Sequence, residues 1–69
     1  MTEYAIYKSR GDSWVELYRC ADRDDTEVRF TEFLSGKTFK TFDIKNHEVS
    51  CTTLDGTTYT FSEEVEGWS

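Results

Sequence analysis

VSCTTLDGTTYTF, residues 49–61, decides the fold, because β-branched and aromatic residues lead into a single Asp-Gly pair and away from it again. Residues of these types suit a pleated, half-buried strand, and Gly supplies the left-handed backbone of a tight turn. Two such runs around an Asp-Gly pair are typical of a β-hairpin. The sequence therefore predicts two antiparallel strands here.

Two loop lengths are open to this hairpin, and they give different registers. A two-residue turn at positions 55–56 sets Cys51 opposite Thr60, which divides the apolar side chains between the two faces of the sheet. A three-residue loop at positions 54–56 pairs Cys51 with Tyr59 instead and gathers them on one face. Since a slip of one residue moves every side chain to the other face, we predict the longer loop.

The same period of two runs through the whole chain. Short stretches rich in Thr, Tyr, Phe and Val are bounded by Gly, Asp, Asn and Ser, as in strands joined by turns. We predict six strands: Glu3 to Lys8, Trp14 to Cys20, Val28 to Leu34, Thr38 to Ile44, Val49 to Thr53 and Thr57 to Ser62.

Pairing these strands gathers the apolar side chains on one face. The other registers are Ile6 with Val15 around Arg10-Gly11, Phe30 with Phe42 and Val28 with Ile44 around Gly36, and Ile44 with Val49 around residues 45–48. The resulting apolar face holds Tyr4, Ile6, Val15, Leu17, Val28, Phe30, Leu34, Phe42, Ile44, Val49, Cys51, Tyr59 and Phe61. This face is the expected core.

An apolar sheet face without a helix to cover it either curls into a small barrel or stacks on a second copy. We predict an all-β fold: a single small domain in which a six-stranded antiparallel meander curls into a partly open barrel of SH3-like size. Residues 1–62 form this domain, and residues 63–69 form an acidic C-terminal tail. The connection over residues 21–27 is the longest and has room for a helical turn.

The charge of the chain is concentrated rather than spread. Fourteen acidic residues face eight basic ones, which gives a formal net charge of −6. The surplus lies in two short stretches: Asp22, Asp24, Asp25 and Glu27, and Glu63, Glu64 and Glu66. Because the rest of the chain is electroneutral, these stretches are two places where a basic partner could dock.

The face opposite the expected core carries five aromatic residues: Tyr7, Trp14, Tyr18, Phe33 and Phe39. Tyr7 and Trp14 are cross-strand neighbours in the expected register. Aromatic pairs of this kind stabilise sheets, and clustered exposed aromatic side chains also anchor protein interfaces. The sequence leaves both interpretations open.

No pattern for a catalytic, metal or cofactor site emerges. Asp22 and Asp24 begin like a calcium loop, but positions six and twelve of that loop would be Glu27 and Phe33, which fail the pattern. His47 and the two cysteines supply too few ligands for zinc. We expect no enzyme activity, no metal and no cofactor.

The same composition bears on compartment and ligand class. No apolar run reaches even ten residues, so we expect no membrane segment and a cytoplasmic protein with two reduced thiols, Cys20 and Cys51. Lysines and arginines outside the acidic stretches are matched by carboxylates, and the acidic surplus repels phosphate. Direct binding of nucleic acid is therefore not expected.

The leading hypothesis is a small acidic protein-binding module that acts stoichiometrically, as an inhibitor that occupies a basic, nucleic-acid-binding surface of a partner protein. Its binding residues would be the two acidic stretches together with Tyr7, Trp14 and Tyr18. The charge profile is similar to that of small virus-encoded inhibitors of bacterial defence, some of which mimic the charge of DNA. The alternative is a structural subunit that self-associates through the aromatic face. The first predicts a monomer and the second a homodimer.

Overall fold

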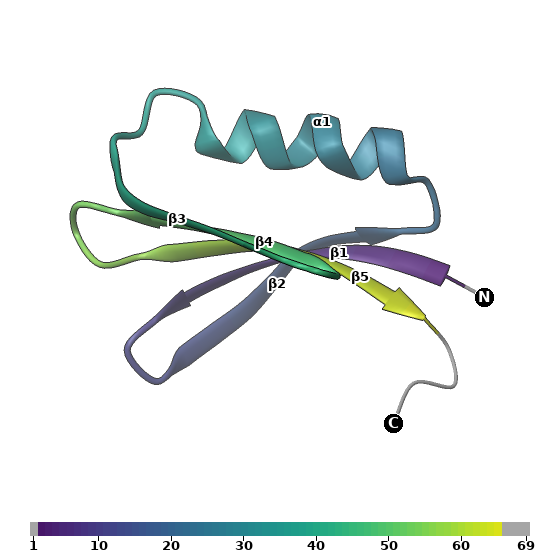
Figure 1. Ribbon diagram of the computed structural model, residues 1–69, viewed down its shortest axis with the longest axis horizontal. Coiled ribbons are helices and arrows are strands. Elements are labelled where there is room, and N and C mark those ends of the chain that lie inside the picture. Colours follow the sequence, from purple (N-terminus) through teal and green to yellow (C-terminus); the bar gives the residue numbers. More distant parts are fainter. Residues whose placement is uncertain (1, 66–69) are drawn as a thin grey trace.

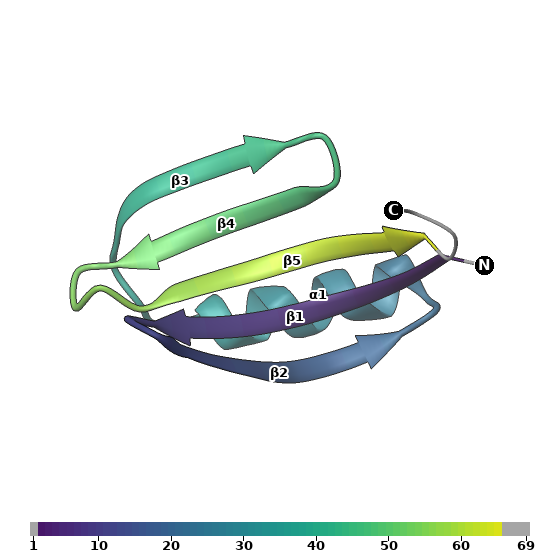
Figure 2. The ribbon, with the colours of Figure 1, turned by 90° about the horizontal axis from the view of Figure 1, so that it is seen from below.

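The computed structural model describes residues 2–65, which form one five-stranded antiparallel sheet with a helix lying across one face (Figure 1). The elements in chain order are β1 (Thr2–Arg10), β2 (Ser13–Cys20), α1 (Arg23–Leu34), β3 (Phe39–Lys45), β4 (Glu48–Thr53) and β5 (Thr58–Val65). The order across the sheet is β2-β1-β5-β4-β3, so that the first and last strands are neighbours (Figure 2).

The expected antiparallel sheet is confirmed, but the six strands and the barrel are not. Residues 28–34, expected as a strand, belong to α1. The sheet is open, with β2 and β3 as its edges. Because α1 covers part of the apolar face, the sheet does not need to close on itself to bury that part. β5 runs to Val65, so residues 63 and 64, expected in a tail, lie in the last strand.

Asp22 is the N-cap of the helix: its side chain accepts a hydrogen bond from the backbone N–H of Asp25 and so caps the first turn. Asp24 and Asp25 place negative charge at the positive end of the helix dipole. Thr26 and Phe30, four residues apart, are its buried residues. A spacing of four residues places both side chains on one face of a helix. The alternation that predicted a strand also included Val28, which is 57% exposed and therefore does not belong to the buried face.

The core lies between α1 and the middle of the sheet. It consists of Ile6, Phe30, Cys51, Tyr59 and Phe61, all less than 9% exposed. The rings of Phe30 and Phe61 join helix to sheet, with centroids 5.7 Å apart. Four residues expected in the core are instead largely exposed: Val15, Val28, Phe42 and Ile44.

Two of the expected registers are confirmed. In the hairpin of β4 and β5, Cys51 pairs with Tyr59, and Gly56 in the loop has a φ of +90°. In the hairpin of β3 and β4, Phe42 pairs with Cys51 and Ile44 with Val49, as expected.

The register predicted for the first hairpin is wrong. The turn consists of Gly11, at φ +60°, and Asp12, because Arg10 pairs with Ser13. A bulge next to Ile6 then shifts the register again, and Ile6 lies opposite Tyr18 rather than Val15. A bulge inserts one extra residue in one strand, which a regular alternation cannot reveal.

Replacing Gly56 tests the turn. Gly56→Val is expected to lower the free energy of unfolding by about 1–3 kcal/mol, because a β-branched residue is strained at positive φ. An added Cβ would meet nothing within 4 Å, so the effect would come from the backbone alone. Urea unfolding measures it, with Gly56→Asn as the milder control, since Asn tolerates left-handed backbone. Equal stability of Gly56→Val and the parent would contradict this turn geometry.

The Asp55 carboxylate, in the same turn, makes the stability of the fold depend on pH. It accepts hydrogen bonds from the Thr53 hydroxyl and, at 3.0 Å, from the Thr57 backbone N–H, and these lower the pKa of Asp55 to about 2. Its ionised form therefore stabilises the fold above the ordinary carboxyl pKa of roughly 4, and this stabilisation is lost as pH falls towards 2.

We accordingly expect Asp55→Asn to be less stable than the parent at pH 7, with the difference closing between about pH 4 and pH 2. Urea unfolding across this pH range measures it. Asp12→Asn, at the tip of the first hairpin, is the matched control. A difference that stayed constant with pH would show that the charge of Asp55 is irrelevant.

Candidate protein-binding surface

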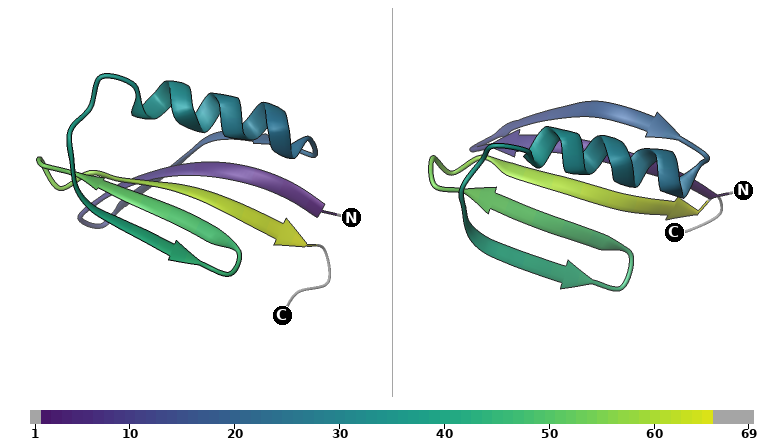
Figure 3. Two further views of the ribbon diagram at one scale, coloured as in Figure 1. Left: turned by 45° about the horizontal axis from the view of Figure 1, so that its top comes forward. Right: turned by 90° about the horizontal axis from the view of Figure 1, so that it is seen from above.

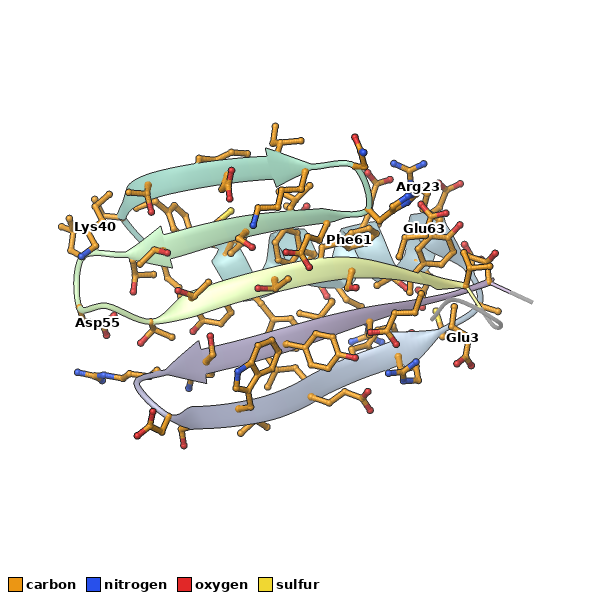
Figure 4. All side chains as sticks on the ribbon, turned by 60° about the horizontal axis from the view of Figure 1, so that its bottom comes forward. Glu3, Arg23, Lys40, Asp55, Phe61 and Glu63 are labelled. Carbon is orange, nitrogen blue, oxygen red and sulfur yellow. The ribbon has the colours of Figure 1, made fainter. Side chains whose placement is uncertain are left out.

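The fold brings the two acidic stretches, about forty residues apart in sequence, to the same end of the molecule. At this end α1 begins, β1 begins and β5 ends (Figures 2 and 3). Thr2 pairs with Val65 here, and the backbone N–H of Glu63 donates to the His47 carbonyl at 2.8 Å. In Figure 4 Glu3, Arg23 and Glu63 lie towards one end of the molecule, and Lys40 and Asp55 lie at the opposite end.

We call this region the acidic end. Its carboxylates come from four parts of the chain: Glu3, Asp22, Asp24, Asp25, Glu27, Glu48, Glu63 and Glu64. The cationic side chains of the same region are Arg19, Arg23 and Lys45. Acids thus outnumber bases by more than two to one, whereas at the opposite end (Figure 4) Lys8, Arg10, Lys37 and Lys40 outnumber Asp12 and Asp55. The molecule is an electric dipole as well as a net anion.

Some carboxylates of the acidic end already have structural roles. Asp22 caps α1. Asp25 accepts a hydrogen bond from the Tyr18 hydroxyl. This bond, followed by one to Cys20, raises the pKa of Tyr18 to about 12. Replacing Asp22 or Asp25 would therefore disturb the fold as well as the charge.

Glu64 belongs to a network on the open face of the sheet, centred on Arg19. The Arg19 guanidinium lies 2.8 Å from carboxylate oxygens of Glu16 and Glu64 and 3.2 Å from Glu3, and it donates to the Tyr7 hydroxyl at 2.9 Å. Tyr7 in turn donates to Glu64 at 2.5 Å. Burial and then this bond raise the pKa of Tyr7 to about 12, while the bond from Tyr7 and those from Arg19 lower the pKa of Glu64.

Other carboxylates of the acidic end have fewer contacts. Asp24 and Glu27 are exposed and form no ion pair with any of residues 2–65. Glu63 lies 3.9 Å from the His47 imidazole, and both are partly exposed. Glu66, the last member of the expected set, lies outside the described residues. The free negative charge of this end therefore sits mainly on the first two turns of α1.

The aromatic patch on the open face of the sheet is smaller than predicted. Tyr7 and Trp14 do meet, edge to face with ring centroids 5.2 Å apart, and Trp14 is 64% exposed. Trp14 pairs with Ser9, so this contact is diagonal rather than directly cross-strand. Tyr18 was expected beside them but lies on the helix side, because the bulge turns it over, and Arg29 lies over its ring. Phe33 and Phe39, placed on this face by the sequence analysis, pack against the core.

An apolar groove next to the acidic end was not predicted. It has a volume of about 680 Å³ and runs between α1 and β4 and β5. Val28, Phe30, Val49 and Phe61 form its floor and walls, and Asp24 and Glu27 are among the residues at its rim. The groove could not be predicted from a sequence pattern in which Val28 and Phe30 belong to a strand.

The described residues give no sign of a metal site or a disulfide. No group of three or more His, Cys, Asp or Glu side chains within residues 2–65 is placed to hold a metal ion. Cys20 and Cys51 are free thiols, and burial raises the pKa of Cys51. No helix in this range is long and apolar enough to cross a membrane.

Comparison with known proteins finds no match for this chain. No family model matches the chain, and neither a curated protein nor a solved structure does.

Proposed function

We propose that this chain is a stoichiometric protein-binding module of the cytoplasm whose acidic end docks on a basic surface of a partner protein. A basic surface that binds nucleic acid is the target that fits best, since the acidic end would compete with phosphates for it. In this role the chain is an inhibitor, works without a cofactor and binds no nucleic acid itself.

The convergence of the two acidic stretches carries the proposal. Repulsion among carboxylates at one end costs stability, so such a cluster is retained more readily where it serves binding. Asp24 and Glu27 are held on a helix, and a rigid element positions charges better than a loop. A concentrated negative field also steers a basic partner into encounter and speeds association.

Neutralising Asp24 and Glu27 tests the proposal at a small cost to the stability of α1, since neither side chain caps the helix or forms an ion pair within residues 2–65. Asp24→Asn/Glu27→Gln and the control Asp12→Lys both change the net charge by two units, and Asp12 lies in the turn of the first hairpin, away from the acidic end. Each is used as bait in nuclease-treated lysate at roughly 50 mM and roughly 500 mM salt. We expect the parent and the control to retain basic proteins at low salt, and the acidic-end variant to lose them.

Titration of a captured protein then gives rates. The acidic-end variant should associate roughly tenfold more slowly at low salt, and the difference should shrink at high salt. Nucleic acid should displace the module from the captured protein. If the acidic-end variant captured and associated like the parent at low salt, the acidic end would be a solubility feature.

The exposed aromatic pair favours a second candidate function. Trp14, against Tyr7, gives an aromatic contact point on the open face, which a structural subunit could use to self-associate. Sedimentation of the parent and of Trp14→Ser separates the two. A homodimer that Trp14→Ser dissociates would support the subunit, whereas a monomer in both cases supports the binding module.

A further inference from the structure

The helix covers only part of the sheet. Within residues 2–65 the backbone of α1 lies near β1, β2 and β5 and not near β3 or β4. Figure 3 shows β3 and β4 beside the helix rather than beneath it. A helix is about 10 Å wide and strands lie about 4.8 Å apart, so one helix covers two to three strands. A five-stranded sheet has room for one more helix on this face.

The uncovered part of this face is apolar. Phe42 pairs with buried Cys51, and Ile44 pairs with Val49, so both project from the helix side of the sheet. Phe42 is 63% and Ile44 is 70% exposed. These are large apolar side chains on the face that elsewhere forms the core. Ile44 adjoins the groove through its partner Val49, and Phe42 lies two residues away on the same face of edge strand β3. The two side chains therefore continue the apolar surface from the groove to the edge of the sheet.

The rim of the groove on the α1 side is acidic. Asp24, Glu27 and Glu32 line it, against a single cation, Arg23. An occupant therefore needs an apolar stripe for the floor and positive charge on the flank that faces α1. A second copy of this chain would set two such acidic rims against each other, which favours a different, basic partner.

We propose that this groove is the docking site for one amphipathic, basic α-helix of a partner protein, packed on β3 and β4 alongside α1. The inference rests on the proposed function and names the partner's binding element. The exposed strands are roughly 20 Å long, which a helix of about 14 residues spans. Apolar residues at i, i+3, i+4 and i+7 would contact Phe42, Ile44 and Val49, with Lys or Arg beside Asp24 and Glu27.

A synthetic helix tests the docking site directly. The probe is a fluorescently labelled 16-residue peptide with Leu on one face and Lys and Arg on its flanks. Its control has the same composition in an order that spreads Leu around the helix. Fluorescence anisotropy measures both affinities, and nuclear magnetic resonance shift mapping locates the contact. We expect the amphipathic peptide to bind at least about tenfold more tightly and to shift β3, β4 and α1.

Two exposed residues of similar accessibility make the matched variants. Ile44→Ser, on the exposed apolar face beside the groove, should weaken binding of the amphipathic peptide at least about tenfold. Leu54→Ser, in the loop before β5 and 66% exposed, should leave that binding unchanged. Glu27→Gln/Glu32→Gln should weaken binding of the amphipathic peptide at low salt only. Circular dichroism checks that each variant is folded.

Three outcomes would overturn the docking site. They are no binding of the amphipathic peptide up to millimolar concentration, equal binding of the two peptides, or equal effects of Ile44→Ser and Leu54→Ser. A parent dimer that Ile44→Ser dissociates would show that a second copy fills the groove instead. None of these outcomes changes the expected result of the lysate experiment with Asp24→Asn/Glu27→Gln. The proposal for the acidic end is therefore tested independently.

Discussion

Phe30→Ala is expected to lower the free energy of unfolding by about 3–5 kcal/mol, a large part of what a domain of this size has. Phe30 is 8% exposed and joins α1 to β5 through Phe61. Removing its ring leaves a cavity between the helix and the sheet, in the middle of the core. Urea unfolding followed by circular dichroism measures the loss, and Phe30→Leu provides a milder step if Phe30→Ala does not fold.

Phe42→Ala is the matched control, and it should cost less than about 1 kcal/mol, because the ring is 63% exposed. The barrel expected from the sequence put both rings in one core, as a cross-strand pair, and so required similar losses. A large loss at Phe42 with a small one at Phe30 would contradict the placement of α1.

The parts of the fold that the sequence predicts are those fixed by local rules. The β4–β5 hairpin follows from one glycine at positive φ and the alternation on either side of it. The β3–β4 hairpin follows from keeping Ile44 and Val49 on one face. In both cases a slip of one residue would have divided the apolar side chains between the two faces, so the pattern alone selects the register.

The helix was missed because its sequence satisfies two periods at once. Val28, Phe30 and Leu34 alternate as in a strand, while Thr26, Phe30 and Leu34 recur every four residues as in a helix. The deciding signal was the cap: Asp22 lies three residues before Asp25, with further acid in the first turn. Reading residues 21–27 as a charged loop hid that signal.

The candidate site was predicted only in part, for a topological reason. Sequence alone identified both acidic stretches, because charge can be counted. Their meeting at one end depends on β1 and β5 being neighbours, which brings the last strand back to the start of α1. The groove depends on where α1 lies on the sheet, which no local pattern encodes. Both features therefore required the structure.

The largest expected effect is the difference between the reaction rates of the two thiols. Cys51 is fully buried, and burial raises its pKa, which disfavours the reactive thiolate. Cys20 is partly exposed, at the end of β2. With iodoacetamide under native conditions, we expect Cys51 to react roughly 10³-fold or more slowly than Cys20, because it becomes accessible only when the sheet opens.

Mass spectrometry of Cys20→Ser and Cys51→Ser, each with a single thiol, measures the two rates. Adding Phe30→Leu should speed the labelling of Cys51 and leave Cys20 almost unchanged, since the buried thiol reports the opening of the core that Phe30 holds closed. Comparable rates for the two thiols in the parent would mean that β4 is accessible from the open side of the groove. In that case the uncovered apolar face of β3 and β4 would extend as far as Cys51. A partner helix bound on that face should then slow the labelling of Cys51.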